Sequence, residues 1–181
     1  MIIKINNRAG AGIFTILAFA VLILFGSWTS FENLPKSFQK KINKVIPQLW
    51  GQELGLQPSA INEPIKNQLA KFGADAVFDV VSDGQTRGYV VVAKARSKFE
   101  NFDYVIYYDQ NKIIKAVRVL QYREDYGGEI ASKRWLKQFD GKDAESPIKI
   151  DEDIQGISGA TISYRAITSG VKNITQIMNE I

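Results

Sequence analysis

The sequence predicts an α+β protein, in which an N-terminal transmembrane helix precedes a single domain with an antiparallel β-meander packed by helices. Three observations support this fold class. Residues 9–28 form an uncharged, apolar stretch, four segments rich in β-branched and aromatic residues lie between residues 76 and 122, and apolar residues recur with a helical period at the end of the chain. A length of 181 residues suits one membrane anchor and one domain of ordinary size.

The first predicted element is the apolar stretch 9–28. As a helix it would span about 30 Å, which is the thickness of the hydrocarbon core of a bilayer. Trp28 and Phe31 stand where interfacial aromatic side chains are common. A cleaved signal peptide is the alternative, but no Ala-x-Ala pattern follows Phe25, and a lipoprotein signal needs a cysteine that the chain lacks. We therefore expect residues 9–28 to be a retained signal anchor.

Charge around this stretch predicts the orientation. Lys4 and Arg8 are the charged residues before it, so residues 1–8 are expected to stay in the cytoplasm. The rest of the chain would then lie on the periplasmic side of the cytoplasmic membrane. The group of lysines at 36–44 weakens this bias without reversing it.

Residues 29–58 are predicted to form a juxtamembrane amphipathic helix and a connector. Apolar residues of the segment Ser37–Leu49 fall on one helical stripe and lysines on the other, with Ser37 as the N-cap and Pro47 ending or kinking the helix. The helix could pack on the domain with its lysines in solvent, or it could lie on anionic lipid headgroups. Residues 51–58 read as a connector.

Residues 59–181 are predicted to form one extracytoplasmic domain. A short helix over 59–72 is interrupted near Pro64, and four strands follow at 76–81, 88–95, 104–108 and 113–122, separated by turn residues. A helix over 131–139 ends before Gly141. The last helix begins at Ser163 as its N-cap and buries an apolar stripe of Tyr164, Ile167, Val171, Ile174, Met178 and Ile181.

Composition excludes several classes of chemistry. The chain has no cysteine and no histidine, so it cannot hold a disulfide, a thiolate nucleophile, an iron–sulfur cluster, a usual zinc site or a histidine-dependent triad. No metal site is predicted. Beyond residue 30 the chain carries 21 basic and 19 acidic residues, a net charge of +2, and such a balance does not favour a nucleic-acid partner. Redox or group-transfer chemistry would therefore need a bound cofactor.

One segment has the composition of a phosphate-binding loop. Residues 155–163 read Gln-Gly-Ile-Ser-Gly-Ala-Thr-Ile-Ser and lead directly into a helix. Small residues allow close approach of the backbone, and the amide groups and dipole of a helix N-terminus favour an anion. Composition alone favours the simpler interpretation, an ordinary loop followed by a helix cap.

The sequence Ser158-Gly159-Ala160-Thr161, followed by an apolar and a hydroxyl residue, resembles the signature of the FMN-binding domain family. That family includes subunits of the Rnf electron-transport complex and of the sodium-translocating NADH:quinone reductase. The order of elements over residues 75–181, together with the anchor, is similar to the family as well. The resemblance implies that Ser158, Gly159, Ala160, Thr161 and Ser163 form a cofactor-binding site.

The resemblance also implies a covalent cofactor. In the family, the threonine at the position of Thr161 carries FMN through a phosphoester bond, which a magnesium-dependent flavin transferase installs from FAD. The implied function is a membrane-anchored electron relay within a membrane oxidoreductase complex, with the other subunits, the transferase and the membrane as partners. Such a chain would be an electron-transfer subunit rather than a self-standing enzyme. Tyr126, Trp135 and Tyr164 are candidate neighbours of the flavin ring, and Arg165 is a candidate partner of the phosphate.

The sequence departs from the family pattern at two places. Gln155 stands where the family commonly has aspartate, and residues 124–129 keep only Glu124 and Gly127 of a longer common motif. Two other functions therefore stay open. The chain could be an anchored binding or assembly module that keeps the fold without flavin, or a self-standing flavin reductase.

Overall fold

A computed structural model describes residues 30–181 of the chain. The expected cytoplasmic N-terminus at 1–8 and the expected anchor at 9–28 lie outside the described residues. Among residues 30–181, no helix is both long enough and apolar enough to cross a membrane.

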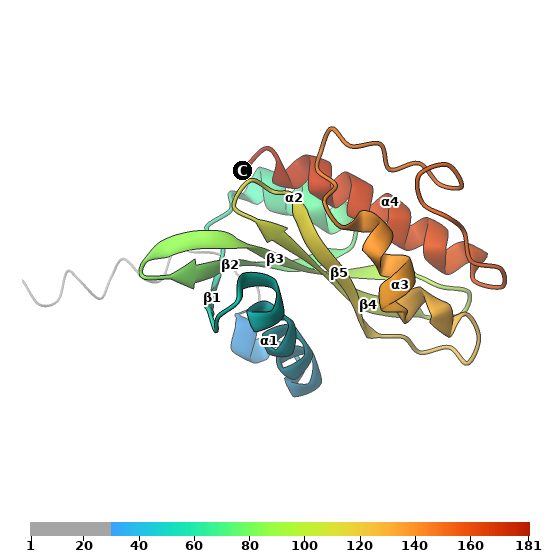
Figure 1. The fold of residues 1–181 in the computed structure, drawn as a ribbon, viewed down its shortest axis with the longest axis horizontal. Helices are drawn as coiled ribbons and strands as arrows, with labels where there is room; N and C mark the ends of the chain where they lie inside the picture. The colour runs from blue at the N-terminus through green and yellow to red at the C-terminus, as the bar shows by residue number, and fades with distance from the viewer. Residues whose placement is uncertain (1–29) are drawn as a thin grey trace, which may run out of the picture.

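The domain is built on one antiparallel sheet of five strands in sequence order (Figure 1). The strands are β1 (Gly55–Pro58), β2 (Ala74–Ser82), β3 (Gln85–Arg96), β4 (Asn101–Asp109) and β5 (Ile114–Gln121). The predicted meander is confirmed as β2 to β5. A two-residue turn joins β2 to β3, where Asp83 and Gly84 have φ angles of 51° and 71°, as a type I′ hairpin turn requires.

The first strand differs from the sequence prediction, which placed a connector at 51–58. β1 pairs antiparallel with β2, from Gly55 opposite Val81 to Pro58 opposite Phe78. Its glycine and proline argue against a strand in isolation, but an edge position needs few of its own hydrogen bonds and tolerates both residues. The sheet therefore has five strands instead of four.

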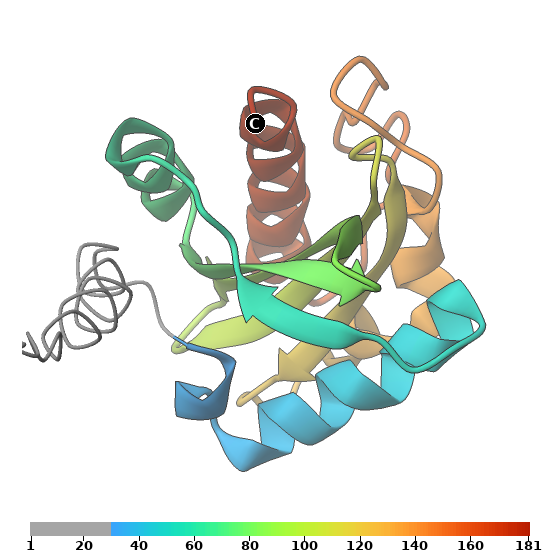
Figure 2. The ribbon, with the colours of Figure 1, turned by 90° about the vertical axis from the view of Figure 1, so that its left-hand side faces the viewer.

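Helices cover both faces of the sheet, and two cores result (Figure 2). Along β4, alternate side chains point to opposite sides: Tyr104, Ile106 and Tyr108 join the core under α4 (Thr161–Met178), while Val105 and Tyr107 join the core under α1 (Lys36–Trp50). The sheet thus separates an α4 side from an α1 side.

Helix α1 packs against the domain, as one of the two interpretations of its pattern predicted. It buries Phe38, Ile42 and Ile46 against the sheet and leaves its lysines exposed. One detail of the prediction was wrong, because the helix begins after Pro35 rather than at a Ser37 cap. Of the two effects expected of Pro47, it does not end the helix, which continues to Trp50.

Helix α2 (Glu63–Lys71) begins where the sequence predicted an interruption. Asn62 is its N-cap and its side chain accepts a hydrogen bond from the Ile65 amide at 3.0 Å. Pro64 lies in the first turn, where the missing N–H has no helical partner to lose. Proline therefore starts this helix and does not break it.

The predicted helix at 131–139 is divided into three short pieces. A 3-10 turn, η3 (Gly128–Ala131), is followed by α3 (Lys133–Leu136) and a second 3-10 turn, η4 (Lys137–Phe139). Trp135, Leu136 and Phe139 are buried as the pattern predicted. These pieces cover the end of β5 on the α4 side of the sheet.

Candidate functional site

The site begins with the first turn of α4, which starts at Thr161. Ala160 occupies the N-cap and offers no capping side chain. The prediction that Ser163 caps this helix was wrong, because the helix starts two residues earlier. The amide groups of the first turn therefore have no side-chain cap, and they provide the donors and the dipole that bind an anion.

Ser163 has a structural role in a buried set of hydroxyl groups. Its Oγ lies 2.6 Å from Ser97 Oγ and 3.1 Å from the Tyr122 hydroxyl, which are themselves 3.1 Å apart. Ser163 is only 2% exposed. These hydrogen bonds join α4 to the ends of β3 and β5 directly beneath the motif.

We expect Ser163→Ala to lower the free energy of unfolding by about 1 kcal/mol, through loss of these hydrogen bonds and not of a helix cap. Ser97 and Tyr122 keep their bond to each other, which limits the effect. Urea unfolding of the full chain measures it. Ser158→Ala, at an exposed position of the same motif, is the control and should unfold like the wild type. Equal destabilisation by the two substitutions would contradict this role.

A hollow of about 560 Å³ opens beside the first turn of α4. Four of the five residues predicted as a cofactor site line it: Gly159, Ala160, Thr161 and Ser163. Thr161 is an exposed residue at this hollow. Ser158 is also exposed, but it is not among the lining residues.

Gly159 sets the path of the motif into the helix. Its φ angle is +82°, a conformation that L-residues adopt only with strain. Ala160 follows in a position that is only 4% exposed, so a small side chain is needed there. The motif thus turns Thr161 outward while Ala160 is packed inward.

The opposite wall of the hollow comes from two loops that the sequence analysis left without a role, apart from Tyr126. It contains Ser97, Lys98 and Phe99 from the β3–β4 loop, and Tyr122, Glu124 and Tyr126 from the segment after β5. Phe99 is 78% and Tyr126 is 82% exposed, the largest values among the exposed large apolar side chains of residues 30–181. Exposed aromatic side chains at the rim of a hollow offer stacking surface to a planar ring.

Glu124 holds the β3–β4 loop in place. Its Oε1 accepts hydrogen bonds from the Phe99 amide at 2.7 Å and the Glu100 amide at 3.2 Å. The hydrogen bond from Phe99 is the main cause that lowers the pKa of Glu124. This residue is one of the two that keep the family pattern after the last strand, and the structure gives it a role in shaping the wall.

The hydrogen bonds of Glu124 predict a pH dependence of the loop. The pKa of this carboxyl group is lower in the folded state than in the unfolded state. Its contribution to holding the loop is therefore complete at pH values above the unfolded-state pKa, and it is lost as the pH falls through the folded-state pKa. We expect the amide resonances of Phe99 and Glu100 in the full chain to titrate together below the ordinary value of 4.5. Glu124→Gln should abolish this titration. A midpoint at or above 4.5 would contradict it.

Gly127 is the other residue that keeps the family pattern. Its φ angle is +77°, and a Cβ atom there would lie 2.9 Å from Ala160 Cβ and 3.1 Å from the Tyr122 hydroxyl. A Cβ contact of 2.9 Å is too short for an ordinary packed side chain. The backbone after β5 therefore lies directly against the motif, and glycine is what allows this approach.

The structure separates the other candidate residues. Trp135 donates from Nε1 to the Gln155 carbonyl at 2.7 Å and lines a second hollow, of about 830 Å³, with Gln155 and Gly156. Tyr164 is buried and its hydroxyl donates to Asp151 at 3.1 Å. Of the three candidate ring neighbours, Tyr126 alone shares the hollow with Thr161.

Arg165 is engaged elsewhere. Its guanidinium forms an ion pair with Asp151 at 3.0 Å. The cationic side chain that lines the hollow is Lys98, whose Nζ lies 4.9 Å from the centre of the Phe99 ring. Sequence reasoning had no signal for Lys98, because its place depends on the β3–β4 loop folding back over α4.

An uncapped helix N-terminus beside an exposed threonine, in a hollow with exposed aromatic side chains at its rim, can hold a phosphate group together with a planar ring. Residues 100–176 match the FMN-binding domain family. The segment begins with β4 and ends in the last turn of α4, and it contains the motif, Glu124 and Gly127. The resemblance to this family expected from the sequence is confirmed over these residues.

The chain is also similar to a subunit of the Na(+)-translocating ferredoxin:NAD(+) oxidoreductase complex of Acetobacterium woodii. The two sequences are 28% identical over 161 residues, which cover 83% of this chain and 72% of that protein. The similarity thus extends well beyond the matched domain.

Proposed function

We propose that this chain is a membrane-anchored, extracytoplasmic flavoprotein that carries FMN on Thr161 through a phosphoester bond and relays electrons within a membrane oxidoreductase complex. The observation that carries the proposal is the position of Thr161. This exposed residue stands at an uncapped helix N-terminus and lines the hollow of about 560 Å³. The family match and the similarity to the Acetobacterium woodii protein support the same function.

The residues of the hollow fit the parts of FMN. The first-turn amides of α4 and Lys98 would hold the phosphate, because both favour negative charge. Phe99 and Tyr126 would contact the isoalloxazine ring with their exposed faces. When bound, this ring accepts and donates one or two electrons. The chain contributes binding, orientation and partial exclusion of water.

Attachment needs a second protein. Thr161 Oγ would form the new bond to the flavin-side phosphorus of FAD, the pyrophosphate bond would break, and AMP would leave. The hydroxyl proton needs a base, and the chain has no histidine to supply one. A flavin transferase is therefore the proposed partner for maturation, and the other subunits of the complex are the proposed electron-transfer partners.

Co-expression with a flavin transferase tests the proposal. The full chain should give a band near 20 kDa that fluoresces under ultraviolet light on a denaturing gel. The tryptic peptide that contains Thr161 should show the mass of an FMN adduct. Expression without the transferase is the control and should give neither signal. Absence of the adduct with an active transferase would overturn the proposal and favour an anchored binding or assembly module that carries no flavin.

The proposed location gives a separate prediction. Because Lys4 and Arg8 favour a cytoplasmic N-terminus, alkaline phosphatase fused after Ile181 should be active, as it is only outside the cytoplasm. A β-galactosidase fusion at the same position is the control and should be inactive. Protection of the domain from protease in intact spheroplasts would contradict this orientation.

A further inference from the structure

A small cavity of about 190 Å³ lies between α1 and β5, on the side of the sheet opposite α4. Its lining includes four cationic side chains and no carboxylate: Lys41, Lys44, Arg118 and Lys133. It is therefore a compact, positively charged cavity.

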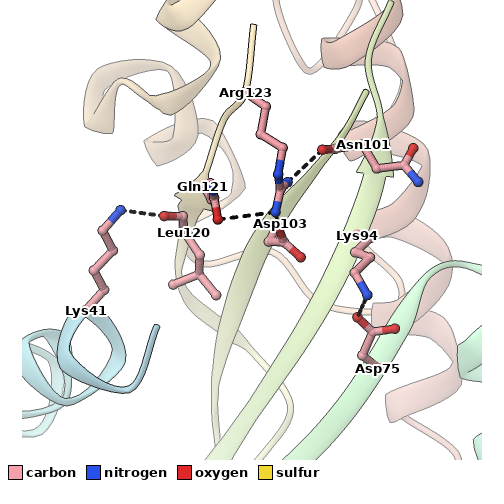
Figure 3. Close-up of polar contacts among 8 residues, drawn as sticks. All are labelled: Lys41, Asp75, Lys94, Asn101, Asp103, Leu120, Gln121 and Arg123. Atoms are coloured by element: carbon pink, nitrogen blue, oxygen red, sulfur yellow. Dashed lines mark hydrogen bonds and ion pairs between the residues drawn. The ribbon is translucent and has the colours of Figure 1, made fainter. Parts of the chain in front are cut away.

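These cations differ from others on the same side of the sheet. Lys94 pairs with Asp75 at 2.7 Å and Arg123 with Asp103 at 2.6 Å (Figure 3). Within residues 30–181, none of the four cavity cations has a carboxylate within ion-pair distance. Four positive charges gathered without a carboxylate partner repel one another, and an anion between them would remove this repulsion.

Two residues that line the cavity also carry a buried polar atom without a partner. The Tyr107 hydroxyl and Arg118 Nε are both buried and form no hydrogen bond, and both residues line the cavity. Tyr107 has no exposed surface. Buried donors of this kind are costly unless a water, an ion or a ligand accepts from them.

The remaining contacts position the cations without neutralising them. Lys41 reaches from α1 and donates from Nζ to the Leu120 carbonyl, as Figure 3 shows. An ammonium group has three donors, so two remain for a ligand. Arg118 donates from Nη1 to the Val117 carbonyl at 2.7 Å. Asp140 is close enough to Arg118 to feel its charge: burial raises the pKa of Asp140, and the charges of Arg118 and Lys137 oppose part of that rise.

We propose that this cavity between α1 and β5 binds a phosphate group. Guanidinium and ammonium groups around a neutral hydroxyl donor match the oxygens of a phosphate. The group could belong to a free phosphate or to the headgroup of an anionic phospholipid, since both present the same oxygens. The cavity is separate from the proposed flavin site, because α1 and α4 cover opposite faces of the sheet.

Thermal unfolding of the full chain in a neutral detergent tests the proposal. Inorganic phosphate, exchanged for chloride at constant ionic strength, should raise the Tm in a saturable manner. The double variant Lys44→Gln/Arg118→Gln should weaken phosphate binding by about tenfold or more. The control variant Lys36→Gln/Lys40→Gln removes two exposed charges outside the cavity. It should leave phosphate binding unchanged.

Two further measurements identify the molecule that supplies the phosphate group and test the Tyr107 hydroxyl as a hydrogen-bond donor to it. Tighter binding of dibutyryl phosphatidylglycerol than of inorganic phosphate would assign the site to lipid, and the reverse would assign it to free phosphate. Tyr107→Phe keeps the ring and should weaken binding several-fold while the Tm without phosphate does not fall. If Tyr107→Phe binds phosphate as tightly as the wild type does, the hydroxyl of Tyr107 does not take part in the site.

A Tm shift no larger than that given by chloride would overturn the proposal. So would a shift that survives in Lys44→Gln/Arg118→Gln, because the anion would then bind elsewhere, as at the first turn of α4. If the double variant does not fold, Lys44→Gln alone serves, since Lys44 is exposed. Lys44, Tyr107 and Arg118 do not line the hollow beside Thr161, so the variants test this cavity whether or not Thr161 carries FMN.

Discussion

Thr161→Ala is expected to abolish covalent FMN completely while the fold survives. Its hydroxyl is the proposed ester oxygen, and alanine has no atom that could replace it. The side chain is exposed and begins α4 without being its cap, so its removal costs little packing. Mass spectrometry of the tryptic peptide, with a transferase present, measures the adduct, and the Tm measures the fold.

Ser158→Ala is the matched control for this prediction. It removes an exposed hydroxyl three residues earlier that does not line the hollow, and it should retain the adduct. An adduct that persists in Thr161→Ala, or that maps to Ser158 or Ser163 in the wild type, would show that the attachment site is elsewhere. Thr161→Ser keeps a hydroxyl at the same position and tests whether the methyl group matters.

Gly127→Ala is expected to have the largest effect on stability among the changes around the hollow. The substitution places a side chain at a φ angle of +77° and a Cβ atom 2.9 Å from Ala160 Cβ. The strained conformation and the contact together should cost about 2 kcal/mol, or roughly 4–8 °C in Tm for a domain of this size. Because Ala160 must shift, the flavinylated fraction should fall too.

Gly128→Ala is the neighbouring control. A Cβ atom at Gly128 would meet nothing within 4 Å, and its backbone is not in the left-handed region. Both stability and flavinylation should stay near the wild-type values. If the two alanine variants behave alike, close approach of this segment to the motif does not govern the site.

Much of the sheet could be predicted because local composition and tertiary structure agree. Segments such as Gly88–Ala95 and Tyr104–Tyr108 are rich in β-branched and aromatic residues, and they lie within β3 and β4. β1 was missed because Gly55 and Pro58 disfavour a strand, and only pairing with β2 makes one. Ser37 and Ser163 were wrongly predicted as N-caps because tertiary packing, and not local sequence, also sets where a helix begins. A serine near a helix start has the right chemistry, but the helix begins where packing places it.

The site could be predicted only as far as it is contiguous in sequence. The motif at 158–163 was found as a string, and four of its predicted residues do line the hollow. Ser97, Lys98 and Phe99 could not be found, because they reach the motif through the register of β3 and β4 and the hold of Glu124 on their loop. The motif in the sequence therefore locates one wall of the hollow, and the other wall is known only from the fold.

The three hydroxyl groups beneath the motif link chain segments that lie 66 residues apart, from Ser97 to Ser163. A peptide that contains only residues 155–163 would have the signature but neither the β3–β4 loop nor the segment after β5. The hollow beside Thr161 therefore exists only after the meander has formed and α4 has docked on it. If the proposed attachment at Thr161 uses this hollow, it follows folding, and a variant that folds slowly would present the completed site late.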